Sequence, residues 1–149
     1  YAEKNGLIGF TFNSPNLSLA KCQIPRWEGC VSANQEMINW HEETNIPLFS
    51  WSAQAGGFFS GKFSRDNFDD QEMVDVFYNK ENWERYDRAV ELAKKKNVSP
   101  TQIALAYVLH QKFPTTAVIG PEKLDELLSS YNGSNIELTS KEVEWLDLK

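Results

Sequence analysis

The sequence predicts an α/β fold in which short parallel strands alternate with helices. Three apolar runs of strand length, at residues 7–12, 46–51 and 115–120, are separated by segments with helical periodicity. Because each connection can hold a helix, we expect the strands to run parallel through right-handed crossovers. A sheet of only three strands would keep two open edges, so the pattern is typical of the later part of a larger α/β unit.

The N-terminal stretch is predicted to contain the end of a helix and the first strand. Residues 1–6 end at Gly6, the residue type that commonly terminates helices in the left-handed conformation. Tyr1 is not a methionine, so we expect further residues upstream. The run 7–12 alternates apolar and small residues, which predicts a strand. The segment that follows, to about Ser32, reads as an ordered loop.

Cap residues mark the starts of several predicted helices. Ser32 stands three residues before Gln35, and Thr139 stands three before Glu142, which is the spacing of a capping box. Ser99 precedes a proline at the first helical position, a favoured arrangement. With apolar periodicity added, helices are predicted at 32–45, at the end of 63–79, and at 81–97, 99–111, 121–133 and 139–149.

Composition excludes some classes of function. The net charge of −6 argues against a nucleic-acid groove, and the basic run Lys94–Lys96 reads as a solvated helix end. No apolar stretch is long enough for a membrane span and no signal peptide is apparent, so we expect no membrane partner and a cytoplasmic protein. Cys22 and Cys30 are eight residues apart, which fits neither a redox pair nor a zinc knuckle, and we expect free thiols.

The segment 49–63, FSWSAQAGGFFSGKF, follows the second predicted strand and is rich in small residues. Loops after the carboxyl ends of parallel strands bind ligands, and small residues let backbone N–H groups approach an anion. The helix that begins near Pro121 would add the partial positive charge of its N-terminus. Both segments are therefore candidates for phosphate binding.

Four stretches, taken together, resemble the aldo-keto reductases. Residues 50–63 resemble the strand-seven loop of that family, which wraps the pyrophosphate of a dinucleotide. Residues 10–20 resemble the sixth strand and its loop, 99–111 the helix usually written TPAQLALAWLL, and 115–130 the eighth strand and the adenine-side helix. The resemblance implies that residues 1–149 form one segment, the C-terminal half of a (β/α)8 TIM barrel, with no separate second domain.

The resemblance also implies a cofactor site. Trp51 would stack on the nicotinamide ring, and its alternative role is that of a buried aromatic at a strand end. Ser14 occupies the place where the family commonly has a glutamine for the carboxamide, and its hydroxyl is shorter and has one donor. The pyrophosphate would be lined by Ser52, Ala53, Gln54, Ala55 and Gly56, with Lys62 as a charged partner.

On the adenosine side the resemblance implies contacts from Gly120, Glu122, Lys123, Glu126, Ser129 and Ser130. NADP is the cofactor that the family implies. Glu122 and Glu126 would repel a 2′-phosphate and Lys123 is the only local cation, so NAD is also possible, and these acids can also be read as part of an ordinary surface helix.

The family's proton donor, a tyrosine assisted by lysine, aspartate and histidine, belongs to the first four strands. This sequence corresponds to later strands, and no tyrosine in it shows such partners in the sequence. His41 and His110 read as helix-surface or packing residues. We therefore predict no catalytic residue and no metal ligand in this chain.

The function implied for the parent enzyme is NAD(P)H-dependent reduction of an aldehyde or ketone. This chain would supply the nicotinamide-stacking, pyrophosphate and adenosine side of the cofactor site, with a small carbonyl compound as substrate. It would associate with a missing N-terminal half or with itself. The alternative is a non-catalytic half-barrel that binds a nucleotide or a partner chain.

Overall fold

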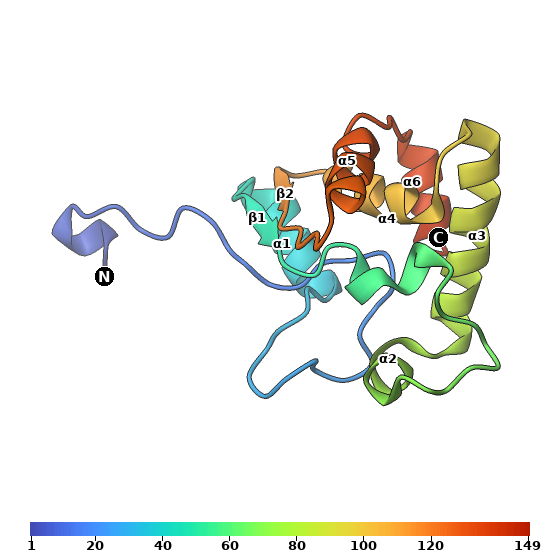
Figure 1. Cartoon of the computed structure of the whole chain (residues 1–149). Coiled ribbons are helices and arrows are strands. Elements are labelled where there is room, and N and C mark those ends of the chain that lie inside the picture. Colours follow the sequence, from blue (N-terminus) through green and yellow to red (C-terminus); the bar gives the residue numbers. More distant parts are fainter.

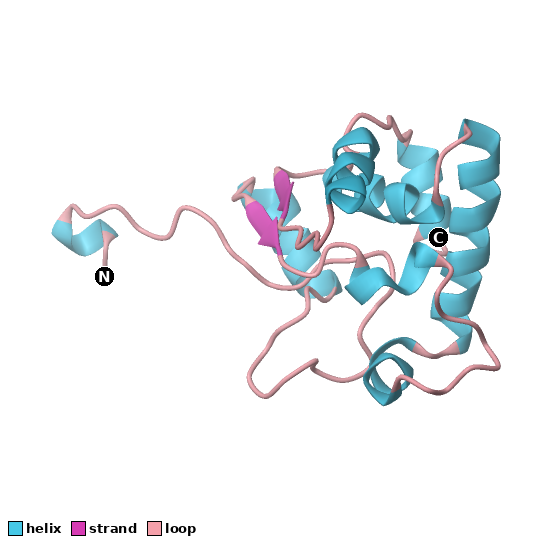
Figure 2. Ribbon diagram, in the orientation of Figure 1, coloured by secondary structure: helices cyan, strands magenta, loops and turns pink.

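A computed structural model describes all residues 1–149 and shows mostly helices, with a small parallel sheet at one edge of the body (Figure 2). Strand β1 (Leu48–Ser50) pairs in parallel with β2 (Thr115–Ala117), with Leu48 opposite Thr115 and Ser50 opposite Ala117. The connection between the two strands contains several helices, as a parallel pair requires. The predicted α/β class is confirmed.

The prediction of a strand at residues 7–12 is wrong. These residues form an extended arm that leaves the body of the molecule (Figure 1), and the side chains of Ile8 and Phe10 are 89% and 98% exposed. Pairing begins only at Asn13, which forms a single parallel bridge with Leu48. An alternating sequence forms a strand only where a neighbouring strand pairs with it, and no strand pairs with residues 7–12, although the Phe12 ring packs against Phe49 of β1.

The helices follow the prediction closely. They are η1 (Glu3–Asn5), α1 (Gln35–Thr44), η2 (Ala55–Ser60), α2 (Gln71–Phe77), α3 (Lys80–Lys96), α4 (Pro100–Leu109), α5 (Leu124–Gly133) and α6 (Ser140–Leu146). The capping boxes at Ser99 and Thr139 are both present, and Gly6 ends η1 with φ 63°. No helix is both long enough and apolar enough to cross a membrane.

Three element boundaries differ from the prediction. Helix α1 is capped by Asn34 and not by Ser32, because the Asn34 side chain accepts the Met37 N–H at 2.9 Å. Helix α5 begins at Leu124, three residues after Pro121. Strand β2 ends at Ala117, so the residues before Gly120 belong to the loop.

The core lies between η2, α3 and α4. Every residue of α4 from Ile103 to Val108 is buried, and this helix packs against α3, α5, β2 and η2. Phe58 of η2 is fully buried, with its ring centroid 4.8 Å from that of Trp83. The segment that follows β1 is therefore anchored to the core by its aromatic residues, which holds the glycine-rich loop in place.

Candidate functional site

The loops that follow β1 and β2 border one cavity of about 890 Å³. The two loops are far apart in the sequence. They meet in the fold because the carboxyl ends of paired parallel strands are neighbours. The predicted residues that line this first cavity are Ser52, Ala53, Gln54, Gly56, Lys62, Gly120, Glu122, Glu126, Ser129 and Ser130.

Four predicted residues do not line the first cavity. Ala55 is fully buried, and Lys123 is the N-cap residue of α5. The Ser14 hydroxyl donates to the Phe49 carbonyl at 2.8 Å, which directs its proton to the strand β1 backbone. Trp51, half-buried at the end of β1, packs against another tryptophan.

The loop backbone turns through the left-handed region repeatedly. Ser52 and Ala55 have φ of 50° and 53°, and three glycines, Gly56, Gly57 and Gly61, share this region. At Gly56 a side chain would also meet its neighbours, since a Cβ there would lie 3.0 Å from Nη1 of Arg26. A non-glycine residue in this region costs on the order of 1 kcal/mol, so contacts elsewhere must hold the loop in its path.

Side-chain contacts hold the loop on both sides. Gln54 Nε2 donates to Ser130 Oγ of α5 at 3.3 Å, which joins the two halves of the cavity. Arg26 Nη1 donates to Ser52 Oγ at 2.9 Å, and Arg26 Nε donates to Glu72 Oε1 of α2 at 3.0 Å. Sequence reasoning missed Arg26, because a single basic residue in an irregular segment has no pattern that singles it out.

Tryptophan 27 lies beside the predicted stacking residue. The ring centroids of Trp27 and Trp51 are 4.6 Å apart, with their planes tilted by 38°. The Trp51 carbonyl also accepts Asn16 Nδ2 at 2.9 Å, which fixes the end of β1. Together these contacts form a broad aromatic surface beyond the strand, and Trp27 was not predicted because it lies in the irregular segment.

Backbone N–H groups without partners border the first cavity. The N–H groups of Ala53 and Gln54 in the first loop, and of Ile119 and Gly120 in the second, donate to no protein acceptor. The N-cap residue Lys123 gives α5 no side-chain cap. Free donors at one cavity, together with a helix N-terminus, favour an anion.

The charges around the first cavity are divided. Lys62 is its only basic lining residue, whereas Glu122, Asp125 and Glu126 line the side formed by α5. Glu126 Oε2 accepts the Glu122 N–H at 2.9 Å, so this carboxylate folds back over the start of α5. The cavity thus combines a cationic loop side with an acidic helix side. Asp125 was not among the predicted residues, nor were the start of α4 at Ser99 and Thr101, which also line it.

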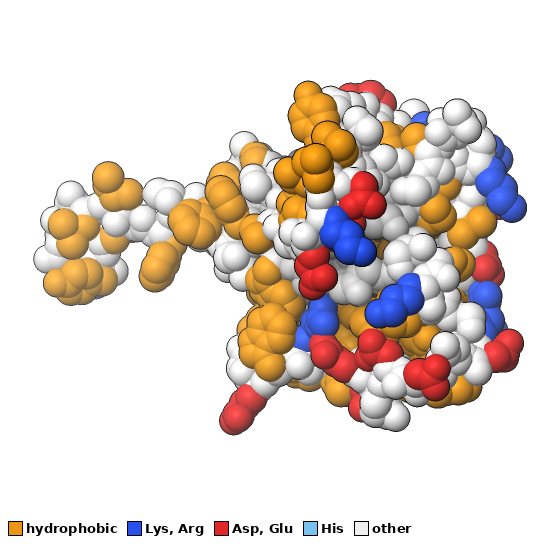
Figure 3. Space-filling model, viewed as in Figure 1, with side chains coloured by type: hydrophobic (Ala, Val, Ile, Leu, Met, Phe, Trp, Pro, Cys, Tyr) orange, Lys and Arg blue, Asp and Glu red, His pale blue; other side chains and the backbone are white.

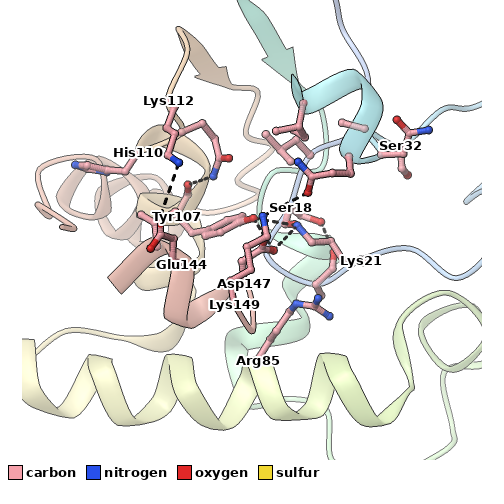
Figure 4. Close-up of a pocket in the computed structure, with 18 of the residues that line it drawn as sticks. Ser18, Lys21, Ser32, Arg85, Tyr107, His110, Lys112, Glu144, Asp147 and Lys149 are labelled. Carbon is pink, nitrogen blue, oxygen red and sulfur yellow. Dashed lines mark hydrogen bonds and ion pairs between the residues drawn. The ribbon is translucent and has the colours of Figure 1, made fainter. Parts of the chain in front are cut away.

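A second cavity of about 550 Å³ shares no residue with the first (Figure 4). Lys21 Nζ lies 3.0 Å from the Tyr107 hydroxyl and 3.1 Å from Asp147 Oδ1, and Tyr107 donates to Asp147 Oδ1 at 3.0 Å. Although the sequence shows no such arrangement, the folded chain gives one tyrosine both a lysine and an aspartate. These groups do not border the first cavity, so they belong to a separate site.

Burial and charge shift the ionisation of the groups at the second cavity. Burial alone would raise the pKa of Asp147, but Lys21 and Lys149 outweigh it and hold that pKa below its ordinary value. The hydrogen bond to Asp147 raises the pKa of Lys149. Burial raises the pKa of the Cys22 thiol, and both Cys22 and Cys30 are free, as predicted.

The two histidines lie apart from the first cavity. His41 is fully buried, with Nδ1 2.7 Å from the Ile46 carbonyl oxygen and its ring stacked on Phe113. His110, at the end of α4, has Nδ1 2.9 Å from the Ala106 carbonyl oxygen. His41 is a packing residue, and His110 is anchored to its own helix and lines the second cavity.

Comparison with known proteins identifies relatives of this chain. It is 27% identical over 115 residues to the probable aldo-keto reductase 1 of Glycine max, an alignment that covers 73% of this chain and 33% of the relative. It is 26% identical over 122 residues to the versiconal hemiacetal acetate reductase of Aspergillus parasiticus, covering 76% of this chain and 35% of the relative. The chain thus spans about a third of the length of these curated relatives.

The fold also matches a solved structure. A crystal structure of the thermostable aldo-keto reductase Tm1743 in complex with the inhibitor epalrestat aligns with a TM-score of 0.60 and 12% identity, covering 91% of this chain and 38% of that one. This similarity confirms the predicted fold, part of an aldo-keto reductase barrel. A sequence profile of the aldo/keto reductase family matches residues 4–149, almost the whole length, and the chain therefore belongs to that family.

Proposed function

We propose that this chain forms the nicotinamide, pyrophosphate and adenosine side of a dinucleotide site in an enzyme that reduces an aldehyde or ketone. The observation that carries this proposal is the meeting of the two loops at one cavity bordered by free N–H groups. Membership of the aldo/keto reductase family supports the reaction class. The small carbonyl substrate, a cytoplasmic location and completion of the barrel by further strands are parts of the same proposal.

The pyrophosphate would lie between the two loops. The free N–H groups of Ala53, Gln54 and Gly120 can donate to its oxygens, and Lys62 adds the one positive charge. Because the Gln54 side chain already bonds Ser130, the loop is positioned before a ligand arrives. Preorganised donors bind an anion with less loss of conformational entropy.

The nicotinamide ring would stack on Trp51, whose own packing against Trp27 orients it. Ser14 donates its only proton to the Phe49 carbonyl, so its hydroxyl oxygen can accept from a carboxamide NH₂ but cannot donate to the carboxamide oxygen. When bound, the cofactor supplies the hydride. No tyrosine or histidine borders the first cavity, so the proton would come from another part of the completed barrel.

Calorimetric titration of NADH and NADPH into the chain tests this site. Trp51→Ala, which removes the stacking surface, and Lys62→Met, which removes the phosphate charge, should each weaken binding about tenfold, or ~1.4 kcal/mol. Lys141→Met, which removes an exposed lysine on α6 that makes no ion pair, should leave affinity unchanged. Equal affinity in the wild type and both site variants would contradict the proposed loop contacts.

The acidic side of the cavity predicts a preference between the two cofactors. Glu122 and Glu126 oppose the extra charge of the 2′-phosphate of NADPH, so we expect NADH to bind more tightly. The double variant Glu122→Gln/Glu126→Gln should tighten NADPH binding on the order of tenfold and change NADH binding little. Glutamine keeps an acceptor for the Glu122 N–H. A parallel gain for both cofactors would show that these acids do not face the 2′ position.

A second candidate function, a non-catalytic half-barrel that binds a nucleotide or a partner chain, has one observation in its favour. Apolar side chains are exposed along the arm, as Figure 3 shows, and at the two strands. They are Leu7, Ile8, Phe10 and Phe12 of the arm, Phe49 of β1, and Val118 directly after β2. A partner or a second copy could cover them. A closed, soluble oligomer of the chain in solution would favour this candidate.

A further inference from the structure

We infer that the second cavity binds a small organic anion, a carboxylate or phosphate compound, whose charged group lies between Arg85 and Lys21. This inference concerns a cavity separate from the proposed dinucleotide site and does not depend on that proposal. It rests on one buried cation without an anionic partner.

Arg85 projects from α3 and lines the second cavity, yet it is only 7% exposed. Its single hydrogen bond runs from Nη1 to Asn82 Oδ1, a neutral acceptor, at 3.1 Å. Nε is the one buried side-chain nitrogen or oxygen of the protein that has no hydrogen-bond partner, and Nη2 also donates to no protein group. A buried charge without a counter-ion is strongly unfavourable in a folded protein.

The other arginines of the chain, unlike Arg85, all pair with a carboxylate. Arg26 pairs with Glu72, Arg65 with Asp87, and Arg88 with Glu84. The side chains of these three arginines are 17%, 50% and 24% accessible, whereas Arg85 is a buried residue. The arginine that most needs a carboxylate therefore lacks one, in a chain whose net charge is −6.

Two of the three carboxylates that line the second cavity are already paired with lysines. Asp147 is shared by Lys21 and Lys149, at 3.1 and 2.8 Å. Glu144 pairs with Lys112 at 3.7 Å, on the far side of Tyr107 in the view of Figure 4. The third carboxylate, Glu42 of α1, makes no ion pair, and neither it nor the two paired acids bonds Arg85.

Arg85 and Lys21 are adjacent through a shared partner. Asn82 Oδ1 accepts both from Arg85 Nη1 and from the Lys21 backbone N–H, the latter at 2.9 Å. Figure 4 shows the Arg85 side chain rising from α3 toward Lys21 and Asp147. The cavity is lined by four cations, Lys21, Arg85, Lys112 and Lys149, and by three carboxylates, Glu42, Glu144 and Asp147, so its charge is net positive. A guanidinium group forms strong, often bidentate, hydrogen bonds with carboxylate and phosphate groups.

Thermal unfolding in phosphate or in succinate tests the inference, with sodium chloride added to hold the ionic strength constant. The midpoint of the wild type should rise by about 4 °C when the anion reaches ten times its dissociation constant. A larger rise in phosphate indicates a phosphate ligand, and a larger rise in succinate a carboxylate. Arg85→Met keeps the volume of the side chain and should abolish the rise.

Two control variants separate this site from others. Lys62→Met alters the first cavity, and Arg65→Met removes an ion pair with Asp87 and contacts with Trp83 that lie outside the second cavity. Both variants should therefore keep the full response. The inference is overturned if neither anion raises the wild-type midpoint, if Arg85→Met keeps the response, or if Lys62→Met abolishes it. The last result would place the anion at the proposed dinucleotide site instead.

A measurement on the wild type keeps the test decisive if Arg85→Met fails to fold. In the ¹⁵N-labelled chain, the Nε–H resonance of Arg85 should shift in a saturable way as phosphate or succinate is added. The Nε–H resonance of Arg65, which is exposed and paired with Asp87, should not shift. An unchanged Arg85 resonance with both anions would exclude binding beside it.

Discussion

Phe58→Ala is expected to lower the free energy of unfolding by about 3–5 kcal/mol, the usual cost of truncating a buried phenylalanine. Phe58 is fully buried. Its ring centroid lies 5.3 Å from that of Phe59 and 5.9 Å from those of Phe77 and Tyr86. The substitution would leave a cavity between η2 and α3 that these rings cannot fill without moving off their preferred rotamers.

Denaturation by urea, followed by circular dichroism, measures this loss. Phe68→Ala provides the control, because Phe68 is 61% exposed and its truncation should change stability by about 0.5 kcal/mol or less. Similar losses in the two variants would contradict the described packing of η2. Since Phe58 lies between Gly57 and Gly61, the same variant should also loosen the glycine-rich loop.

Asp147→Asn is expected to lower stability at pH 7 by about 2–3 kcal/mol, the scale of hydrogen bonds to a charged group. The change leaves Lys21 and Lys149 without their shared carboxylate, and it weakens the acceptor for the Tyr107 hydroxyl. Removing a carboxylate between two ammonium groups also sets those two charges against each other.

The pH dependence of this loss has a definite sign. The pKa of Asp147 in the folded chain lies below its ordinary value of 3.8, so its ionised form stabilises the fold above that value. This stabilisation disappears as the pH falls through the folded-state pKa. The difference between wild type and Asp147→Asn should therefore be largest near neutral pH and shrink below about pH 4.

Unfolding midpoints measured between pH 7 and pH 3 test this prediction. Asp66→Asn is the matched control, because Asp66 is exposed and makes no hydrogen bond or ion pair in the structure. A difference between wild type and Asp147→Asn that stays constant across this range would show that the Asp147 carboxylate contributes packing and not charge.

Local chemistry in the sequence was enough to locate the helices. Ser99 and Thr139 satisfy backbone donors of the turn that follows them, within a few residues, so their roles do not depend on distant contacts. The left-handed glycines of the loop after β1 are equally local, because only glycine adopts that conformation without strain. The family resemblance could likewise be seen in short stretches in a fixed order.

Strand formation depended on partners that the local sequence does not specify. Residues 7–12 have the composition of a strand but pair with nothing in this chain, whereas pairing at Asn13 depends on Leu48. Helix hydrogen bonds close within four residues, but a strand requires a neighbour, so strand extent is decided by tertiary structure.

The sequence by itself determined the helices, the glycine-rich turn and the family of this protein. Only the tertiary structure decided that the loops after β1 and β2 border one cavity, and that Tyr107 meets Lys21 and Asp147. It alone showed that Arg85 is buried without a counter-ion. Charge pairing and cavities are relations between residues that are distant in sequence, so no local pattern can reveal them.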